Sequence, residues 1–311
     1  MITGTYRLDN QRIIEILCGY GTQTENDIFW GLRLPRILLG LAVGGALSLS
    51  GVLLQAVFRN PLVEPYTIGI SGGASFAVCV AVSAGVVSIL GQFSIYIAGF
   101  SGALLVILIL YVLNSRGKIR NINTLLLSGI MLSFIFSSLI MLVLAFSKTE
   151  DAHGILFWLM GNLGHSNLKL SETALLSAFL CLVVVLFYSH ELDALLLGEE
   201  QAGYLGIDVP SAQFRFFIAA SFLTALAVSL SGIIAFVGLA IPLISRKLIG
   251  NKHKYLLPGA FFAGASFLVL CDTFARFIVS PMELPVGVIT GIIGGSLFVW
   301  TLLKNNKKSD I

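Results

Sequence analysis

Long apolar segments separated by short polar stretches recur along most of the chain. Nine of them predict membrane-spanning helices, at residues 36–58, 66–87, 94–114, 122–147, 172–189, 212–231, 233–245, 257–271 and 285–303. A helix needs about 20 residues to cross the hydrocarbon core, so the seventh and eighth segments are short for straight spans. The second contains the flexible run Ser71-Gly72-Gly73. Such interrupted helices favour a role in lining a cavity or gate.

Composition supports a membrane protein. Of the 311 residues, 57% are apolar and only 11% are charged, which is about half the charged fraction of a soluble domain. Mean hydropathy is +0.94. The four cysteines are scattered without the spacing of a metal or disulfide framework, and a net charge of +3 is too small to indicate nucleic-acid binding. We predict an all-α, polytopic membrane protein with one transmembrane domain over residues 1–311.

The distribution of Lys and Arg predicts the orientation, because cytoplasmic loops are enriched in both. A cytoplasmic C-terminus places twelve of the nineteen inside: Arg59, Arg116, Lys118, Arg120, Arg215, Arg246, Lys247, Lys252, Lys254, Lys304, Lys307 and Lys308. With nine spans the N-terminus then lies outside. Residues 1–30 lack the apolar stretch of a signal peptide or span, so we expect them to form an extracytoplasmic segment.

A short repeat connects the two halves of the chain. Ala46-Leu47-Ser48-Leu49-Ser50-Gly51-Val52 matches Ala227-Val228-Ser229-Leu230-Ser231-Gly232-Ile233 at five of seven positions. The two spans are separated by an odd number of crossings, so they run in opposite directions, as in the inverted repeats of transporters. The alternative is chance similarity between two small-residue helix faces, which are common at helix contacts.

Catalytic and nucleotide-binding motifs are not evident. The four histidines lack zinc-site spacing, and there is no Gly-rich phosphate loop, so energy from ATP would have to come through a partner. Residues 190–207 form a predicted cytoplasmic loop with four acids and no Lys or Arg. Its core, residues 194–205, has the pattern of a short amphipathic helix. An acidic helix favours docking to a protein over docking to anionic lipid; the alternative is a solvated acidic loop.

Several motifs resemble those of the FecCD-type permeases, which import iron-siderophores, haem and cobalamin. The resemblance covers essentially residues 28–304. Its motifs are Arg33-Leu34-Pro35-Arg36, the segment Gln55 to Pro65 (QAVFRNPLVEP), Gly69-Ile70-Ser71-Gly72-Gly73-Ala74, Trp158-Leu159-Met160-Gly161-Asn162-Leu163, Leu197-Gly198-Glu199 with Ala202 and Leu205-Gly206, the segment Phe236 to Pro242 (FVGLAIP), Asp272 with Ala275-Arg276, and Glu283-Leu284-Pro285-Val286-Gly287.

The resemblance implies a cobalamin-permease-like bundle that works as a homodimer or pseudo-dimer. Its partners would be two cytoplasmic ABC ATPases, which carry ATP and Mg²⁺, and an extracytoplasmic substrate-binding protein. The chain itself would be no enzyme and would hold no cofactor or metal. The implied ATPase-coupling residues are Leu197, Gly198, Glu199, Glu200, Ala202, Tyr204, Leu205 and Gly206. The implied binding-protein docking residues are Arg33, Arg36 and Arg276; lipid anchoring is the alternative role for these arginines.

The resemblance also implies alternating access through gates on a dimer axis. Gate candidates are Ser71, Gly72, Gly73, Asn121, Asn123 and the outer segment from His153 to Gly164. Members of the family usually have ten spans, and the first is missing here, so either the chain has nine or it begins at an internal start. We expect a bacterial or archaeal cytoplasmic (inner) membrane protein. An ion-gradient-driven secondary transporter is the alternative, and the substrate does not follow from the sequence.

Overall fold

The computed structural model describes residues 10–115, 122–164, 166–278 and 283–306, and in these ranges every regular element is helical. The elements are α1 (Asn10–Leu17), α2 (Gln23–Asn26), the π-helix η1 (Asp27–Arg33), α3 (Leu34–Val57), the 3-10 helix η2 (Pro65–Ile68), α4 (Ile70–Ser83), α5 (Val86–Leu90), α6 (Phe93–Ser115), α7 (Ile122–Phe146), α8 (Thr149–Leu159), α9 (Leu168–Phe187), α10 (Ser189–Leu197), α11 (Glu199–Tyr204), α12 (Val209–Ser231), α13 (Val237–Ile249), α14 (His253–Phe277) and α15 (Val286–Asn306). The predicted all-α fold is confirmed.

Each of the nine predicted segments coincides with a helix, but the lengths differ from those expected. Six helices in the described part of the chain are long and apolar enough to cross a membrane, and α4 and the apolar part of α15 are shorter. The chain is a multi-pass membrane protein. The eighth predicted segment is wrong in length, because α14 has 25 residues. The seventh is short as expected: α13 has 13 residues.

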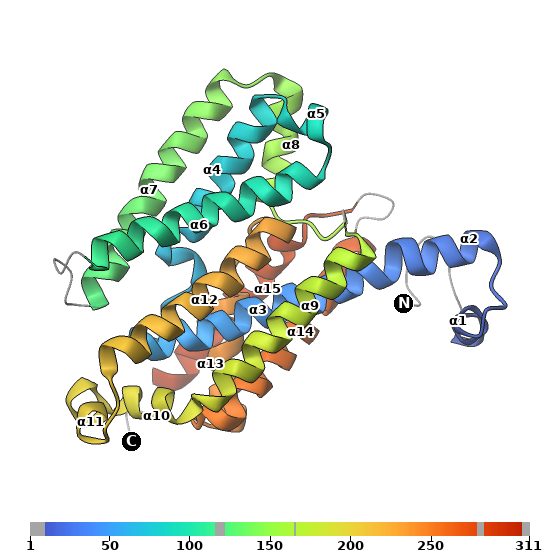
Figure 1. Cartoon of the computed structure of the whole chain (residues 1–311). Helices are drawn as coiled ribbons and strands as arrows, with labels where there is room; N and C mark the ends of the chain where they lie inside the picture. Colours follow the sequence, from blue (N-terminus) through green and yellow to red (C-terminus); the bar gives the residue numbers. More distant parts are fainter. Residues whose placement is uncertain (1–9, 116–121, 165, 279–282, 307–311) are drawn as a thin grey trace.

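The first spanning helix begins well before the predicted boundary. Helices α2, η1 and α3 run on as one helix of 35 residues, Gln23–Val57. Its start is fixed by a capping box in which Thr22 and Glu25 satisfy each other's backbone N–H groups. Figure 1 shows α1 and α2 projecting beyond the bundle at the end opposite α11. The residues that follow Thr22 are polar, so a prediction based on apolar segments placed the start of this helix too late.

Helix α3 is the centre of the bundle, packed against α9, α12, α13 and α14. Of its most apolar window, 83% is buried, against 17% for α7. Small residues allow the close packing: a Cβ on Gly44 would collide with the Gly264 carbonyl oxygen of α14, and one on Gly51 with that of Gly238 in α13. Ser48 Oγ also donates to the Ala260 carbonyl of α14 at 2.7 Å. Backbone contact of this kind is how helices associate tightly in lipid.

A second group of helices, α4 to α8, lies beside the group formed by α3 and the helices packed against it (Figure 1). Helix α4 is its centre and contacts α6, α7 and α8, while α12 joins the two groups by packing on α6 and α4. Helices α6 and α7 are largely exposed along their apolar windows. The exposed apolar side chains of α6 and α7 are therefore available for contact with lipid or with another protein chain.

The matched repeat segments lie on α3 and α12, which pack together and run in opposite directions (Figure 1). Ser50 Oγ of α3 bonds to the Ala220 carbonyl and the Thr224 hydroxyl of α12, both at 2.9 Å. The segment that follows α3 and the segment that follows α12 are also joined by hydrogen bonds. Glu64 Oε1 accepts from the Phe236 N–H at 2.8 Å, where α13 begins, and the Tyr66 hydroxyl bonds to the backbone N–H and C=O of Ile234, each at 3.0 Å.

Candidate functional site

The predicted coupling loop folds as two helices rather than one. Helix α10 ends at Leu197 and α11 begins at Glu199, with Gly198 between them at φ +121°. A side chain at this φ would be strained, and a Cβ there would also collide with Gln201 Oε1. The expected continuous amphipathic helix over residues 194–205 is therefore wrong. A glycine at the break allows the two short helices to meet at a sharp angle.

The apolar residues of the loop divide into a buried and an exposed set. Ala202 is fully buried, whereas Leu197, Tyr204 and Leu205 are 62%, 89% and 64% exposed. Gly206 follows at φ +81° and ends α11 in a left-handed turn. Three exposed large apolar side chains thus lie within nine residues, and Figure 1 places α11, which carries Tyr204, at one end of the bundle. A group of exposed apolar side chains next to polar residues is typical of a protein contact.

The two neighbouring acids of the loop have different surroundings. Glu199 Oε1 accepts from Gln213 Nε2 at 3.1 Å and lies 3.5 Å from Arg59 Nη2. Glu200 is exposed and makes no polar contact with the residues that the structure describes. At the far end of the loop, hydrogen bonds from the hydroxyl and the N–H of Ser211 hold the pKa of Asp208 below its ordinary value. Glu200 is thus the carboxylate most available to a partner.

Helix α10 attaches the loop to the bundle. Its apolar residues Leu192, Ala194 and Leu195 are buried in the core. Asp193 Oδ1 accepts from both the backbone N–H and the ring Nδ1 of His253, at 2.9 and 2.7 Å. Sequence reasoning missed Asp193 and His253, because their contact joins residues 60 apart. One signal was available: α14 begins directly after Lys252, whose side chain does not cap the helix, so a cap from elsewhere in the chain could be expected.

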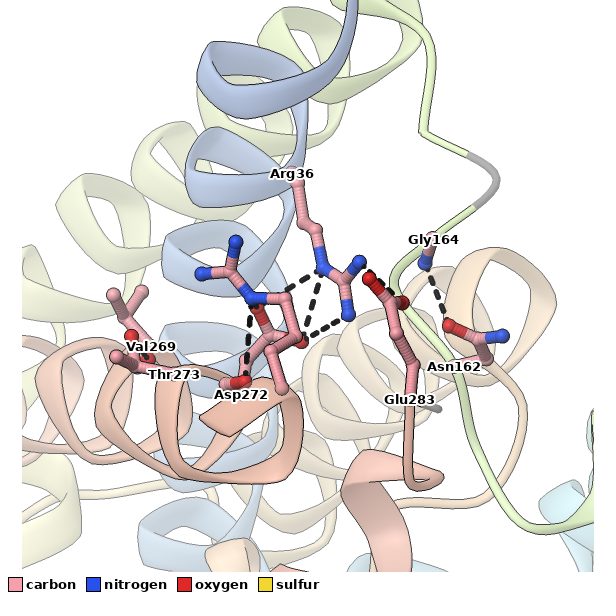
Figure 2. Close-up of polar contacts among 8 residues, drawn as sticks. Arg36, Asn162, Gly164, Val269, Asp272, Thr273 and Glu283 are labelled. Atoms are coloured by element: carbon pink, nitrogen blue, oxygen red, sulfur yellow. Dashed lines mark hydrogen bonds and ion pairs between the residues drawn. The ribbon is translucent and has the colours of Figure 1, made fainter. Parts of the chain in front are cut away.

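At the opposite end of the bundle, Arg36 lies between α14 and the segment that precedes α15 (Figure 2). Its Nε and Nη2 groups donate to the Asp272 carboxylate at 2.8–3.1 Å. Its Nη1 donates to Glu283 Oε2 at 2.8 Å. The Arg36 and Asp272 side chains are only 11% and 6% exposed. The guanidinium therefore connects three parts of this chain through nearly buried, charge-assisted hydrogen bonds.

The other two predicted docking arginines lie in the same cluster. Arg276 Nε is 3.3 Å from Asp272 Oδ2, and its side chain is more exposed than that of Arg36. Arg33 is mostly buried, and its guanidinium is close enough to that of Arg276 for the two charges to interact. The structure thus brings the three arginines together, as the docking prediction requires, but it places Arg36 in an internal ion pair. Of the two arginines in ion pairs, Arg276 has the more accessible charge.

The gate candidates lie at several separate places. Gly72 and Gly73 are helix contacts: a Cβ on Gly72 would be 3.1 Å from Phe136 Cβ of α7, and one on Gly73 would be 2.7 Å from the Gly102 oxygen of α6. Ser71 beside them is buried. Asn121 lies outside the described residues, as does the side chain of Asn123 at the start of α7. These residues remain candidates on the resemblance alone.

The outer gate candidate, His153 to Gly164, comprises most of α8 and the segment after it. His153 is exposed and packs on Phe157, with ring centroids 4.9 Å apart. The Asn162 N–H donates to the Ser231 carbonyl at 2.8 Å, and its Oδ1 accepts from the Gly164 N–H at 2.7 Å (Figure 2). The end of this segment therefore contacts the end of α12 directly.

Comparison with known proteins gives the family. The model of the FecCD transport family matches residues 1–304. This chain belongs to the FecCD transport family. As a FecCD protein it is a transport permease, and the predicted family membership is confirmed.

Relatives and a solved structure support the assignment over the length of the chain. The hemin transport system permease protein HmuU of Yersinia pestis is 35% identical over 294 residues, 92% of this chain and 87% of the relative. The vitamin B12 import system permease protein BtuC of Vibrio vulnificus is 35% identical over 287 residues, 91% and 84% of the two chains. A metal-chelate type ABC transporter in an inward-facing conformation superposes with a TM-score of 0.85 at 33% identity, covering 97% of this FecCD chain and 93% of that one.

Proposed function

We propose that this chain is the permease subunit of an ATP-driven, binding-protein-dependent importer in the cytoplasmic (inner) membrane of a bacterium or archaeon. The observation that carries the proposal is the surface of Leu197, Glu200, Tyr204 and Leu205 at one end of a FecCD permease. Three apolar side chains are exposed there, together with a carboxylate that has no partner among the residues that the structure describes. This combination suits a cytoplasmic ATPase that presents an apolar cleft with basic residues at its edge.

In this proposal the chain carries out no covalent chemistry. Two ATPase subunits bind and hydrolyse ATP with Mg²⁺, and their movement is passed to the permease through α10 and α11. A substrate-binding protein docks at the opposite end, near the cluster of Arg33, Arg36 and Arg276. Because Arg36 is paired internally, Arg276 is the principal candidate for contact with carboxylates of the binding protein.

The exposed side of α7 supports assembly with a second copy of the chain. Phe134, Met141 and Phe146 of α7 are among the large apolar residues that are more than half exposed. In a homodimer this side would meet its counterpart or lipid, and the transport pathway would follow the two-fold axis. Alternating access would then require the segments around Ser71 and α8 to open in turn.

The substrate class we propose is a metal chelate or metal-organic compound, such as haem, cobalamin or an iron-siderophore. The printed names of two relatives, hemin and vitamin B12 permeases, support this class. Both compounds are large and contain a metal ion held by an organic ring. The external binding protein would select among such compounds, since a pathway that must release its cargo cannot bind it tightly.

The test is charge reversal at the exposed carboxylate, with the ATPase copurified from membranes and uptake measured in proteoliposomes. Loss of a charge pair buried at an interface costs about 2–5 kcal/mol, so Glu200→Lys is expected to release the ATPase and abolish ATP-dependent uptake. Glu200→Gln, which keeps the shape without the charge, is the matched control and should have a smaller effect. The double variant Glu199→Lys, Glu200→Lys should be at least as severe.

The result also separates the proposal from a secondary transporter. Wild-type ATPase recovery and uptake in the double variant would contradict the coupling assignment. Uptake that persists without ATPase but stops when an ionophore collapses the ion gradient would support the secondary transporter instead.

A further inference from the structure

The contact between Asp193 and His253 joins a buried side chain at the start of α14 to the coupling loop. His253 is 0% exposed, and one carboxylate oxygen of Asp193 receives both its backbone N–H and its ring Nδ1. Asp193 therefore caps α14 from another helix. A carboxylate at this position also interacts favourably with the positive end of the helix dipole.

The surroundings of the ring define its protonation. Because Nδ1 contacts a carboxylate, it is the nitrogen that carries the hydrogen. Nε2 is buried and has no hydrogen-bond partner in the part of the chain that the structure describes. A second hydrogen at Nε2 would be an unsatisfied buried donor, which is costly. The geometry thus favours a neutral imidazole with a single directed hydrogen bond to α10.

The other ion pairs of the loop each include an exposed arginine, whereas in the Asp193–His253 contact the ring is buried and the carboxylate is 42% exposed. Arg215 meets Glu191 at 2.6 Å with 46% of the arginine side chain exposed, and Arg59 is 3.5 Å from Glu199 with both side chains more than 40% exposed. Exposed ion pairs contribute little to stability because water screens them. A hydrogen bond to a buried ring loses less to solvent, so it holds α10 more firmly than its neighbours do.

Helix α14 extends this contact through the bundle. It runs for 25 residues with Pro258 inside its second turn, packs backbone to backbone on α3 at Gly264, and carries Asp272 and Arg276 near its other end. Packed helices shift as units rather than deforming continuously. A displacement of α10 would therefore move the start of α14 as well, provided that the Asp193–His253 contact holds.

From this geometry we infer that His253 is a positioning residue for energy coupling: it keeps α10 and α14 in register, so that ATPase movement at α11 reaches the membrane helices. The inference rests on the proposed function and adds to it the residue through which the coupling loop acts.

The experiment uses three substitutions at His253 in the complete transporter, reconstituted with its ATPase and binding protein. The side-chain amide of Asn places a donor where Nδ1 lies, whereas that of Gln places its donor where Nε2 lies; Leu places none. We expect His253→Asn to keep the number of substrate molecules transported per ATP within about twofold of wild type. His253→Gln and His253→Leu should lower this ratio about tenfold or more while ATP hydrolysis continues.

A second position guards against misfolding of the His253 variants. The side chain of Asp193 is partly exposed, so the Asp193→Ser variant should fold. It should lower the number of substrate molecules transported per ATP in the same way as His253→Leu. Melting temperatures of all variants are measured in the same detergent. Equal ratios for Asn, Gln and Leu, with only the melting temperature changed, would show a purely structural contact and overturn the inference.

Failure of the inference is distinguishable from failure of the proposed function. If the wild-type permease does not assemble with an ATPase or does not need ATP for uptake, the proposed function is wrong. If wild-type uptake is coupled to ATP and His253→Leu is equally coupled, only the positioning role is wrong.

Discussion

The two ends of α14 use carboxylates in contrasting ways. At the end away from α11, Asp272 binds Arg36 and Arg276, and Glu283 also binds Arg36. At the end near α11, Asp193 binds an uncharged ring, and the neighbouring loop surface is exposed. The arginine cluster pairs its two carboxylates within the chain and leaves Arg276 partly accessible, while the loop keeps apolar groups and Glu200 accessible. The difference indicates that the end with Arg36 is held together mainly by ion pairs within the chain, whereas the loop presents most of its surface to its surroundings.

The largest effect is expected from removing the charge of Arg36. Asp272 is nearly buried and keeps Arg276 at 3.3 Å as a partner when Arg36 is lost. Breaking a buried ion pair by removing one member costs about 3–5 kcal/mol, and the remaining pair reduces this loss. Arg36→Met should therefore lower the melting temperature of the purified permease strongly. The double variant Arg36→Met, Asp272→Leu removes both charges and should recover part of the loss, because it leaves no carboxylate buried. A single variant as stable as wild type would show that the end with Arg36 is not held by this pair.

A smaller effect is expected at the contact that joins α14 to α3. A Cβ on either Gly44 or Gly264 would collide with the backbone of the facing helix, and overpacking typically costs about 1–3 kcal/mol. Gly44→Ala and Gly264→Ala should each lower the melting temperature. Gly291→Ala on α15, where an added Cβ meets nothing within 4 Å, is the matched control and should be neutral or stabilising. Equal behaviour of all three variants would contradict close packing between α3 and α14.

The smallest effect concerns docking of the binding protein at Arg276. Exposed ion pairs contribute roughly 0.2–1 kcal/mol and are screened by salt. Arg276→Gln, which avoids placing a second carboxylate beside Asp272, should slow association of the binding protein at low ionic strength and have little effect at high ionic strength, as measured by surface plasmon resonance. Arg276→Lys is the control that keeps the charge. An association rate unaffected at both salt concentrations, in a variant that melts like wild type, would show that docking occurs elsewhere.

Apolarity predicts where the helices lie, because every spanning segment must bury or present apolar side chains over its length. It does not predict their ends where polar residues continue the helix, as Gln23 to Arg33 do ahead of α3. It also does not predict the division at Gly198, since a glycine is compatible with both a helix end and a helix interior. Local pattern found the coupling loop but not its shape.

Long-range pairs were beyond sequence reasoning for a physical reason. Arg36 and Asp272 are 236 residues apart, and nothing in the neighbourhood of either residue specifies its partner. The motif resemblance brought Arg36 and Arg276 together as docking charges, yet only the packing of α3 on α14 reveals that one carboxylate lies between them. Asp193 and His253 escaped notice in the same way, as single polar residues at helix boundaries.

Helix α13 has a consequence for how the protein is made. It is about 20 Å long, too short to cross the bilayer alone, and the carboxylate at its first turn comes from Glu64, 172 residues earlier. At about 5–20 residues per second, synthesis of that interval takes on the order of ten to thirty seconds. Glu64 is therefore made well before the Phe236 N–H that it accepts from, and this contact at the start of α13 can form only after both residues have been synthesised. A chain that stops before Phe236 should leave Glu64 without this backbone partner.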